Sequence, residues 1–154
     1  MSGATAPSWS LRPAAQADVE RIAELKAQVL RADLERLGRF DAHRVRQRAR
    51  DEFAAGYTSL IEAGDGSFAG SVTFRPAGPG EWALGHFYLA PEFQGRGLGS
   101  AVLGALLARA DAAGVAVRLT VLAGSAARRL YERHGFTVVG RDAIDVFMVR
   151  RPAG

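Results

Sequence analysis

The stretch Gln94-Gly95-Arg96-Gly97-Leu98-Gly99 decides the fold of this chain. It follows an apolar segment, residues 82–89, which Pro91 ends, and it leads into apolar side chains at helical spacing. A glycine-rich turn between a strand and a helix forms an anion site, because its backbone N–H groups converge beside the positive end of the helix. Arg96 adds a guanidinium group that can pair with phosphate. The stretch therefore predicts an anion-binding turn.

Three functional interpretations of this turn compete, beside a flexible loop that merely starts a helix. A Walker loop needs Gly-Lys-Ser/Thr at the start of the helix, and here Gly99 is followed by Ser100 with no lysine. A dinucleotide-binding turn nearly matches from Gly95. However, Ser100 fills its third glycine position, and residues 119–122 offer no acidic side chain for a ribose. The third interpretation depends on a family resemblance.

The turn resembles the cofactor turn of the GCN5-related N-acetyltransferase (GNAT) family, whose pattern is Arg or Gln, two residues, Gly, one residue, then Gly or Ala. Residues 94–99 satisfy every position of that pattern. The preceding Phe87-Tyr88-Leu89-Ala90-Pro91-Glu92-Phe93 resembles the strand and Pro-Glu/aromatic lead-in of the family. A second hallmark, a short helix ending in Tyr-Glu-x-x-Gly-Phe, is similar to Ala127-Arg128-Arg129-Leu130-Tyr131-Glu132-Arg133-His134-Gly135-Phe136. The resemblance covers residues 9–150, strongly in the second half and by layout in the first.

Hydrophobic periodicity and turn residues predict one domain over residues 9–150. The expected strands are 9–12, 57–62, 68–74, 82–89, 115–122, 136–139 and 144–149, and the expected helices lie within 18–38, 41–53, 98–114 and 125–135. This order predicts an α/β fold with a mixed, mainly antiparallel central sheet flanked by helices. The resemblance implies, in addition, splayed parallel strands at the cofactor site.

Particular residues are expected to end these elements. Asp18, Asp41 and Ser125 are expected as helix N-caps, because their short polar side chains accept hydrogen bonds from the first helical N–H groups. Gly135 is expected as the C′ residue of the last helix. Strand 115–122 is rich in β-branched residues, which predicts burial on both faces.

The composition is that of a folded globular protein. The chain has 154 residues, of which 48% are hydrophobic and 23% charged, and its formal net charge is +4. No apolar run approaches the roughly 20 residues of a membrane span, and residues 1–8 are expected to be a disordered tail without signal-peptide features. The absence of cysteine excludes disulfides, thiolate metal sites and a Cys nucleophile. We therefore expect a cytoplasmic protein without a metal or a membrane partner.

The basic balance of charge favours acidic ligands, nucleic acid or a polyphosphate cofactor. A nucleic-acid partner is not expected, because no strand interleaves aromatic and basic residues in an RNA-binding pattern. The resemblance implies acetyl-coenzyme A as co-substrate, with the pantetheine arm bonded by the backbone of two strand residues and the pyrophosphate held by the turn. The cofactor-binding residues implied are Phe87, Leu89, Gln94, Gly95, Arg96, Gly97, Leu98, Gly99, Ser100, Ser125 and Arg128. Many relatives carry asparagine at the position of Ser125, so that residue is either a weaker cofactor contact or only a helix cap.

The resemblance also implies that Tyr131 protonates the leaving thiolate, although an aromatic residue in a short amphipathic helix can equally be core. The family often places a glutamate base on the strand before the turn, and residues 81–86 provide none near the expected splay. His86 is the local candidate for the base, because imidazole titrates near neutral pH. A structural role for His86, and a base formed by Asp145 or an ordered water, stay open.

The segment from Arg31 to Arg50 is dense in arginine, and the resemblance places it on the acceptor side. It is either a solvated helical face or a site for an acceptor that bears carboxylate or phosphate. The function expected is transfer of an acetyl group to a primary amine of a small molecule or peptide, in a possible homodimer. The alternative is an acyl-CoA-binding sensor of the same fold without turnover.

Overall fold

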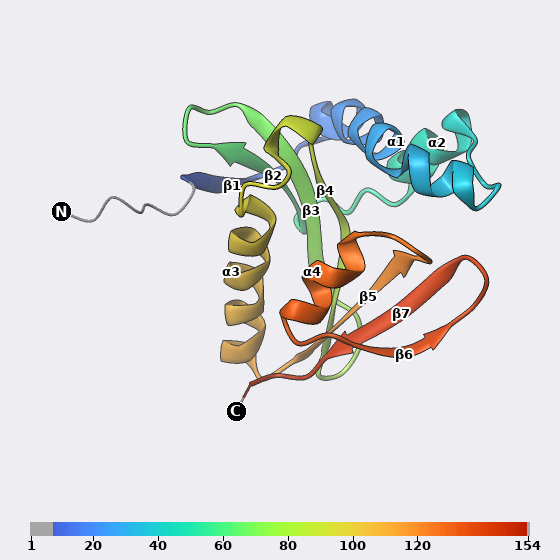
Figure 1. Cartoon of the computed structure of the whole chain (residues 1–154). Helices are drawn as coiled ribbons and strands as arrows, with labels where there is room; N and C mark the ends of the chain where they lie inside the picture. Colours follow the sequence, from blue (N-terminus) through green and yellow to red (C-terminus); the bar gives the residue numbers. More distant parts are fainter. Residues whose placement is uncertain (1–7, 154) are drawn as a thin grey trace.

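A computed structural model describes residues 8–153, so the tail predicted for residues 1–8 lies, apart from Ser8, outside the described residues. The elements are β1 (Trp9–Pro13), η1 (Gln16–Asp18), α1 (Val19–Arg36), α2 (Ala42–Asp51), β2 (Thr58–Ala63), β3 (Phe68–Pro76), β4 (Glu81–Leu89), η2 (Pro91–Phe93), α3 (Leu98–Ala113), β5 (Ala116–Leu122), α4 (Ala127–Arg133), β6 (Thr137–Arg141) and β7 (Asp145–Arg150). The strands form one seven-stranded sheet in the order β1-β2-β3-β4-β5-β7-β6 (Figure 1). The predicted order of helices and strands is confirmed, and with it the fold class.

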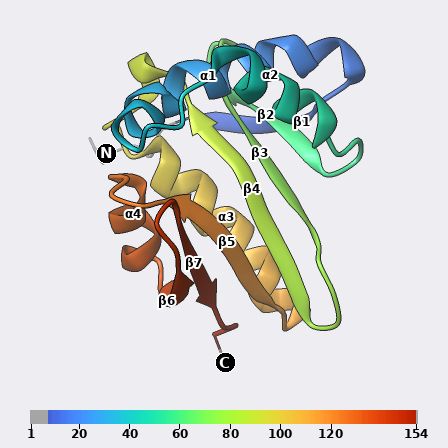
Figure 2. The ribbon, with the colours of Figure 1, turned by 90° about the vertical axis from the view of Figure 1, so that its right-hand side faces the viewer.

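The sheet is antiparallel except at its centre, where β4 and β5 run parallel. Residues 81–83 of β4 pair with residues 116–118 of β5, and the ladder ends there. Figure 2 shows the two strands side by side where they begin and apart where they end. The remainder of each strand therefore presents an unpaired edge to a gap in the sheet. The splayed parallel strands expected from the sequence are present.

Helices cover both faces of the sheet. Leu60 and Ile61 are adjacent on β2 and fully buried, yet they belong to different apolar clusters because successive strand residues point to opposite faces. Leu60 packs with Ile22 of α1, whereas Ile61 belongs to the larger cluster that includes Val102 and Leu106 of α3. The first helices thus lie over one face, and α3 with α4 over the other.

Most of the predicted helix ends are confirmed. The Asp41 side chain accepts a hydrogen bond from the N–H of Arg44 at 3.1 Å, and Gly135, at φ 93°, is the C′ residue of α4. Asp18 is different, because its carboxylate accepts from the N–H of Ala15 at 2.8 Å and makes no capping bond to α1. The reason is the 3-10 turn η1, which the sequence did not indicate. Asp18 ends this turn, and its carboxylate bonds the N–H of Ala15 at the start of the same turn.

The prediction that strand 115–122 is buried on both faces is wrong. Val117, Leu119 and Val121 of β5 are buried, while Arg118 and Thr120 between them are exposed. Helix α3 packs on the first set, whereas α1 packs over β3 and β4 and leaves the second face of β5 open. That open face forms one wall of the gap between β4 and β5.

Candidate active site

One large cleft occupies the gap between the separated ends of β4 and β5, with a volume of about 1240 Å³. We call one part the turn end, which comprises the turn 94–100 and the start of α4, residues 125–127. The other part is the α1–α2 end, which carries His86 and the charged residues Lys26, Asp33, Arg39, Arg44, Arg48, Glu52, Asp142 and Asp145. In Figure 1 the turn lies to the left of α4 and helix α2 to the right.

At the turn end, the backbone N–H groups from Gly95 to Ser100 donate to no backbone or side-chain acceptor among residues 8–153. The first N–H of the α3 ladder to find a partner is that of Ala101, which donates to the carbonyl of Gly97 at 3.0 Å. Gly95 and Gly97 make the turn possible, because their φ angles of 72° and 83° lie in the left-handed region. The result is a row of free donors at the positive end of a helix, which suits an anion.

Side chains near the turn brace it. The Gln94 amide donates from Nε2 to the carbonyl of Leu89 at 2.9 Å, which fixes the turn to the end of β4. Leu98 is buried in the core, so only its backbone is available to a ligand. The hydroxyl of Ser100 lies 2.8 Å from Nε2 of His134, at the end of α4. A Cβ at Gly99 would lie 3.3 Å from Cδ1 of Leu89, so α3 approaches β4 closely here.

The two arginines that were predicted to bind the cofactor do not line the cleft. Arg128 pairs with Glu132 one turn along α4, with 3.3 Å between Nε and Oε2. Arg96 is exposed on the turn, outside the residues that line the cleft. Ser125 does line it, and its Oγ accepts from the N–H of Ala127 at 3.2 Å. The N-cap of α4 is Ala126, so the prediction of Ser125 as N-cap is off by one residue, although its hydroxyl bonds the first N–H of the helix.

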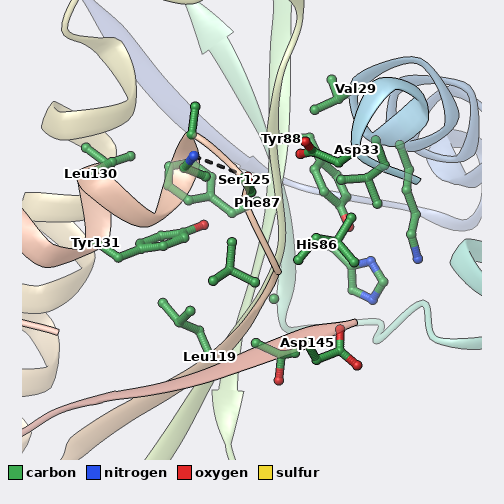
Figure 3. Close-up of a pocket in the computed structure, with 18 of the residues that line it drawn as sticks. Val29, Asp33, His86, Phe87, Tyr88, Leu119, Ser125, Leu130, Tyr131 and Asp145 are labelled. Atoms are coloured by element: carbon green, nitrogen blue, oxygen red, sulfur yellow. Dashed lines mark hydrogen bonds between the residues drawn. The ribbon is translucent and has the colours of Figure 1, made fainter. Parts of the chain in front are cut away.

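Tyr131 lies between the two ends, on the cleft side of α4. Its side chain is 8% exposed and packs edge-to-face on Phe136, with the ring centroids 5.7 Å apart. In Figure 3 its hydroxyl points into the cleft, toward the space between Ser125 and His86. The hydroxyl makes no hydrogen bond to another residue in the described part of the chain and is open to the cleft, while burial of the ring raises the pKa of Tyr131 to about 12. The phenol is therefore protonated at neutral pH and free to donate.

A β-bulge positions His86. Ser71 pairs with Tyr88 and Thr73 with Gly85, so two residues of β4 oppose one residue of β3. His86, at φ 46°, is the only residue other than glycine within 8–153 that has a positive φ. The hydroxyl of Ser71 donates to the His86 carbonyl at 3.1 Å and supports this uncommon conformation. The bulge turns the imidazole toward α1 and α2.

There His86 meets Glu52, which directly follows α2. Nε2 of His86 lies 3.0 Å from Oε1 of Glu52. Burial lowers the pKa of His86, the positive charge of Lys26 lowers it further, and the carboxylate of Glu52 opposes both effects. The histidine is therefore neutral at pH 7. Sequence reasoning missed Glu52 as a site residue because the two partners are distant in sequence and no local motif links them.

Lys26 is the second site residue that sequence reasoning missed. It is the only lysine of the chain, and its side chain is 6% exposed on the stripe of α1 that also buries Val19, Ile22 and Ala23. Burial lowers its pKa, which the nearby carboxylate of Glu52 partly offsets. The helical spacing of this lysine among apolar residues was the available signal.

The opposite wall carries Asp142 and Asp145, at the start of β7. The Asp142 carboxylate accepts hydrogen bonds from the N–H groups of Ile144 and Asp145 at 2.9 and 2.7 Å, and these bonds lower its pKa. Burial raises the pKa of Asp145, whose side chain faces the cleft below His86 in Figure 3. Within residues 8–153, no group of three or more His, Asp or Glu residues is placed to hold a metal ion. Nor does the described part contain a helix that is both long and apolar enough to cross a bilayer.

Comparison with known proteins gives a family and a fold. The model of the acetyltransferase (GNAT) family matches residues 21–136. The PaiA N-acetyltransferase of Thermoplasma acidophilum, solved in complex with coenzyme A, is 18% identical with a TM-score of 0.73, over 94% of this chain and 99% of that one. A protein of Corynebacterium glutamicum described as histone acetyltransferase HPA2 and related acetyltransferase is 22% identical with a TM-score of 0.71, over 96% and 98%. No curated protein matches the chain significantly in sequence.

Proposed function

This chain belongs to the acetyltransferase (GNAT) family, and we propose that it moves an acetyl group from acetyl-coenzyme A to a primary amine. The observation that carries the proposal is the arrangement along one cleft of free N–H donors, a protonated tyrosine and a neutral histidine. Direct transfer needs these three elements, because an anionic ligand must be held, a leaving thiolate protonated and an amine deprotonated.

The cleft suits acetyl-coenzyme A on two counts. The unbonded N–H groups of residues 95–100 suit a pyrophosphate, and the unpaired edge of β4 at Phe87 and Leu89 suits the amides of a pantetheine arm. A solved structure of the same fold was determined with coenzyme A. When bound, acetyl-coenzyme A supplies the thioester whose carbonyl carbon the amine attacks.

His86 is proposed as the base that takes the amine proton. Because Nε2 lies against the carboxylate of Glu52, the neutral ring donates its Nε2 proton there and keeps Nδ1 as the free acceptor. Nδ1 then receives a proton from the amine, directly or through one water. Glu52 acts as a positioning residue, since it selects the tautomer and orients the ring. Asp145 faces the same space, so its variant is the natural comparison for the base.

Tyr131 is proposed as the acid that protonates the leaving sulfur. With its pKa raised to about 12, the phenol keeps its proton at pH 7 and has no internal partner to compete for it. A general acid of this kind contributes roughly 10²-fold or more to the rate. Tyr131→Phe keeps the packing on Phe136 and removes only the hydroxyl.

The test measures coenzyme A release with a panel of primary amines, together with acetyl-coenzyme A binding by calorimetry. Wild-type protein is expected to turn over, and Tyr131→Phe to lose roughly 10²-fold in kcat with unchanged binding of acetyl-coenzyme A. Tyr57→Phe is the matched control, because Tyr57 is 50% exposed and away from the cleft. Tight binding of acetyl-coenzyme A with no turnover on any amine would favour an acyl-CoA sensor instead.

A further inference from the structure

The arginines of the first two helices divide into two groups. Of those that do not line the cleft, Arg36 pairs with Asp33, Arg21 lies over the ring of Phe68, and three more are paired with carboxylates of the first helix. These pairs are Arg31 with Glu35 at 3.3 Å, Arg46 with Glu24 at 2.6 Å and Arg50 with Glu20 at 2.8 Å. The arginines that line the cleft, namely Arg39, Arg44 and Arg48, have no carboxylate within 4.0 Å among residues 8–153.

Lys26 adds a buried cation to the same wall. Its side chain is 6% exposed, it lines the cleft, and it makes no hydrogen bond or ion pair within the described residues. Its electrostatic neighbours are Glu52, which is already bonded to His86, and the like charge of Arg48. No side-chain nitrogen that is fully buried lacks a partner among the described residues, so the ammonium of Lys26 reaches the cleft, where solvent or a ligand can contact it.

The carboxylates at this end of the cleft are mostly committed to other partners. Asp33 accepts from Arg36, Asp142 from two backbone N–H groups and Glu52 faces His86. Asp145 alone lacks a partner within the described chain, and Arg48 acts on it from across the cleft. The cations Lys26, Arg44 and Arg48 therefore line the α1–α2 wall, while Asp142 and Asp145 line the wall opposite.

We infer that the acceptor amine carries an acidic group, a carboxylate or a phosphonate, which Lys26 and Arg48 bind with help from Arg44. This inference rests on the proposed function and names the acceptor class of the same cleft. Lys26 supplies a buried point charge and the arginines supply planar donors for an oxyanion. The acidic group binds toward α2, while the amine of the same molecule lies toward His86. A polycationic amine has no acidic group for Lys26 and Arg48 to bind.

The experiment compares acids with neutral counterparts of the same shape. The probes are L-methionine against L-methioninamide for a carboxylate, 2-aminoethylphosphonate against ethanolamine for a phosphonate, and spermidine as the polycation. Coenzyme A release gives kcat/KM for each. At least one acidic amine is expected to exceed its neutral counterpart by roughly tenfold or more, the usual scale of a charge-assisted hydrogen bond.

Variants locate the preference. Lys26→Met keeps the length and burial of the side chain and removes the charge, so it is expected to reduce the acid-to-neutral ratio roughly tenfold. Arg44→Gln with Arg48→Gln should reduce the same ratio and leave the KM for acetyl-coenzyme A unchanged. Arg46→Gln is the matched control, since Arg46 lies on the same helix, pairs with Glu24 and does not line the cleft.

The outcomes separate the two proposals. Turnover that favours the neutral amines or spermidine, or a preference for acids unchanged in Lys26→Met and in the double arginine variant, overturns the acceptor class and leaves the acetyltransferase proposal standing. No turnover on any amine, despite binding of acetyl-coenzyme A, overturns the proposed function and this inference with it.

Discussion

The two ends of the cleft are built on different principles. The turn end is made of backbone groups from one contiguous segment, residues 94–100, and its donors are positioned by glycine conformation and a helix terminus. The α1–α2 end is made of side chains from α1, α2, β4 and β7, which meet only when the sheet and helices assemble. In the proposed function, the backbone donors bind the pyrophosphate of acetyl-coenzyme A, which is the same whichever amine is acetylated. Side chains from several elements can be substituted independently of one another. We therefore expect the α1–α2 end to determine which amine is accepted.

Among the changes that compare the two ends, the largest effect is expected from placing a charge among the backbone donors. Gly97→Asp adds a carboxylate at a left-handed position, which aspartate adopts more readily than most residues do. A carboxylate about 8 Å from a phosphate at an effective dielectric of about 20 costs about 2 kcal/mol, which is roughly 30-fold in affinity. The KM for acetyl-coenzyme A should rise by that factor while the KM for the amine stays constant.

Gly66→Asp is the control for this substitution, because Gly66 has nearly the same φ, 86°, in the hairpin turn between β2 and β3. Equal kinetic losses in the two variants would show that backbone strain, and not charge at the turn, causes the effect. Loss of amine affinity in Gly97→Asp would contradict the separation of the two ends.

Sequence analysis succeeded where a single segment contains the whole feature. The turn, the short helix with Tyr131 and the glycine ends of helices are local, so spacing and residue type were sufficient to predict them. It failed where the feature depends on assembly. Glu52 meets His86 through a bulge in β4, and η1 redirects Asp18; neither follows from residue type. The open face of β5 depends on which strands α1 covers.

The next effect is a shift in pH dependence at the α1–α2 end. In the proposed mechanism neutral His86 is the active form, so kcat/KM is expected to fall as pH drops through the His86 pKa, which burial and Lys26 hold below its usual value. Lys26→Met removes a like charge, so the His86 pKa rises and the acid limb moves to higher pH. Glu52→Gln removes the charge that favours imidazolium, so the limb moves to lower pH.

The measurement is the pH profile of kcat/KM for wild-type protein and both variants, with Arg46→Gln as the charge-changing control remote from His86. Shifts in opposite directions would identify His86 as the titrating base. If the acid limb of the profile moved in the same direction in both variants, or did not move, a group other than His86 would be responsible for it. Asp145→Asn then tests the alternative on the opposite wall.

The smallest effect concerns the contact that joins the two ends. Nη2 of Arg36, at the end of α1, donates to the Ala123 carbonyl before α4 at 2.6 Å and to Oδ1 of Asp33 at 3.1 Å. Gly124 permits this approach, since a Cβ there would lie 2.8 Å from Nη1 of Arg36. Arg36→Gln should destabilise the fold by about 1 kcal/mol or less, because the side chain is half exposed. The KM values for both substrates should rise roughly two- to fivefold by the same scale.

Urea unfolding and steady-state kinetics measure these changes, and Arg31→Gln is the control, because Arg31 pairs with Glu35 within α1 and makes no contact with the segment before α4. Combining Arg36→Gln with Gly97→Asp asks whether the ends are independent. Sites without shared partners add in free energy to within a few tenths of a kcal/mol. Additive effects on the KM for acetyl-coenzyme A would mean that the turn holds its ligand whatever the position of α1. A non-additive result would mean that α1 and the α4 segment move as one unit, and that the acceptor side then influences how tightly the turn binds.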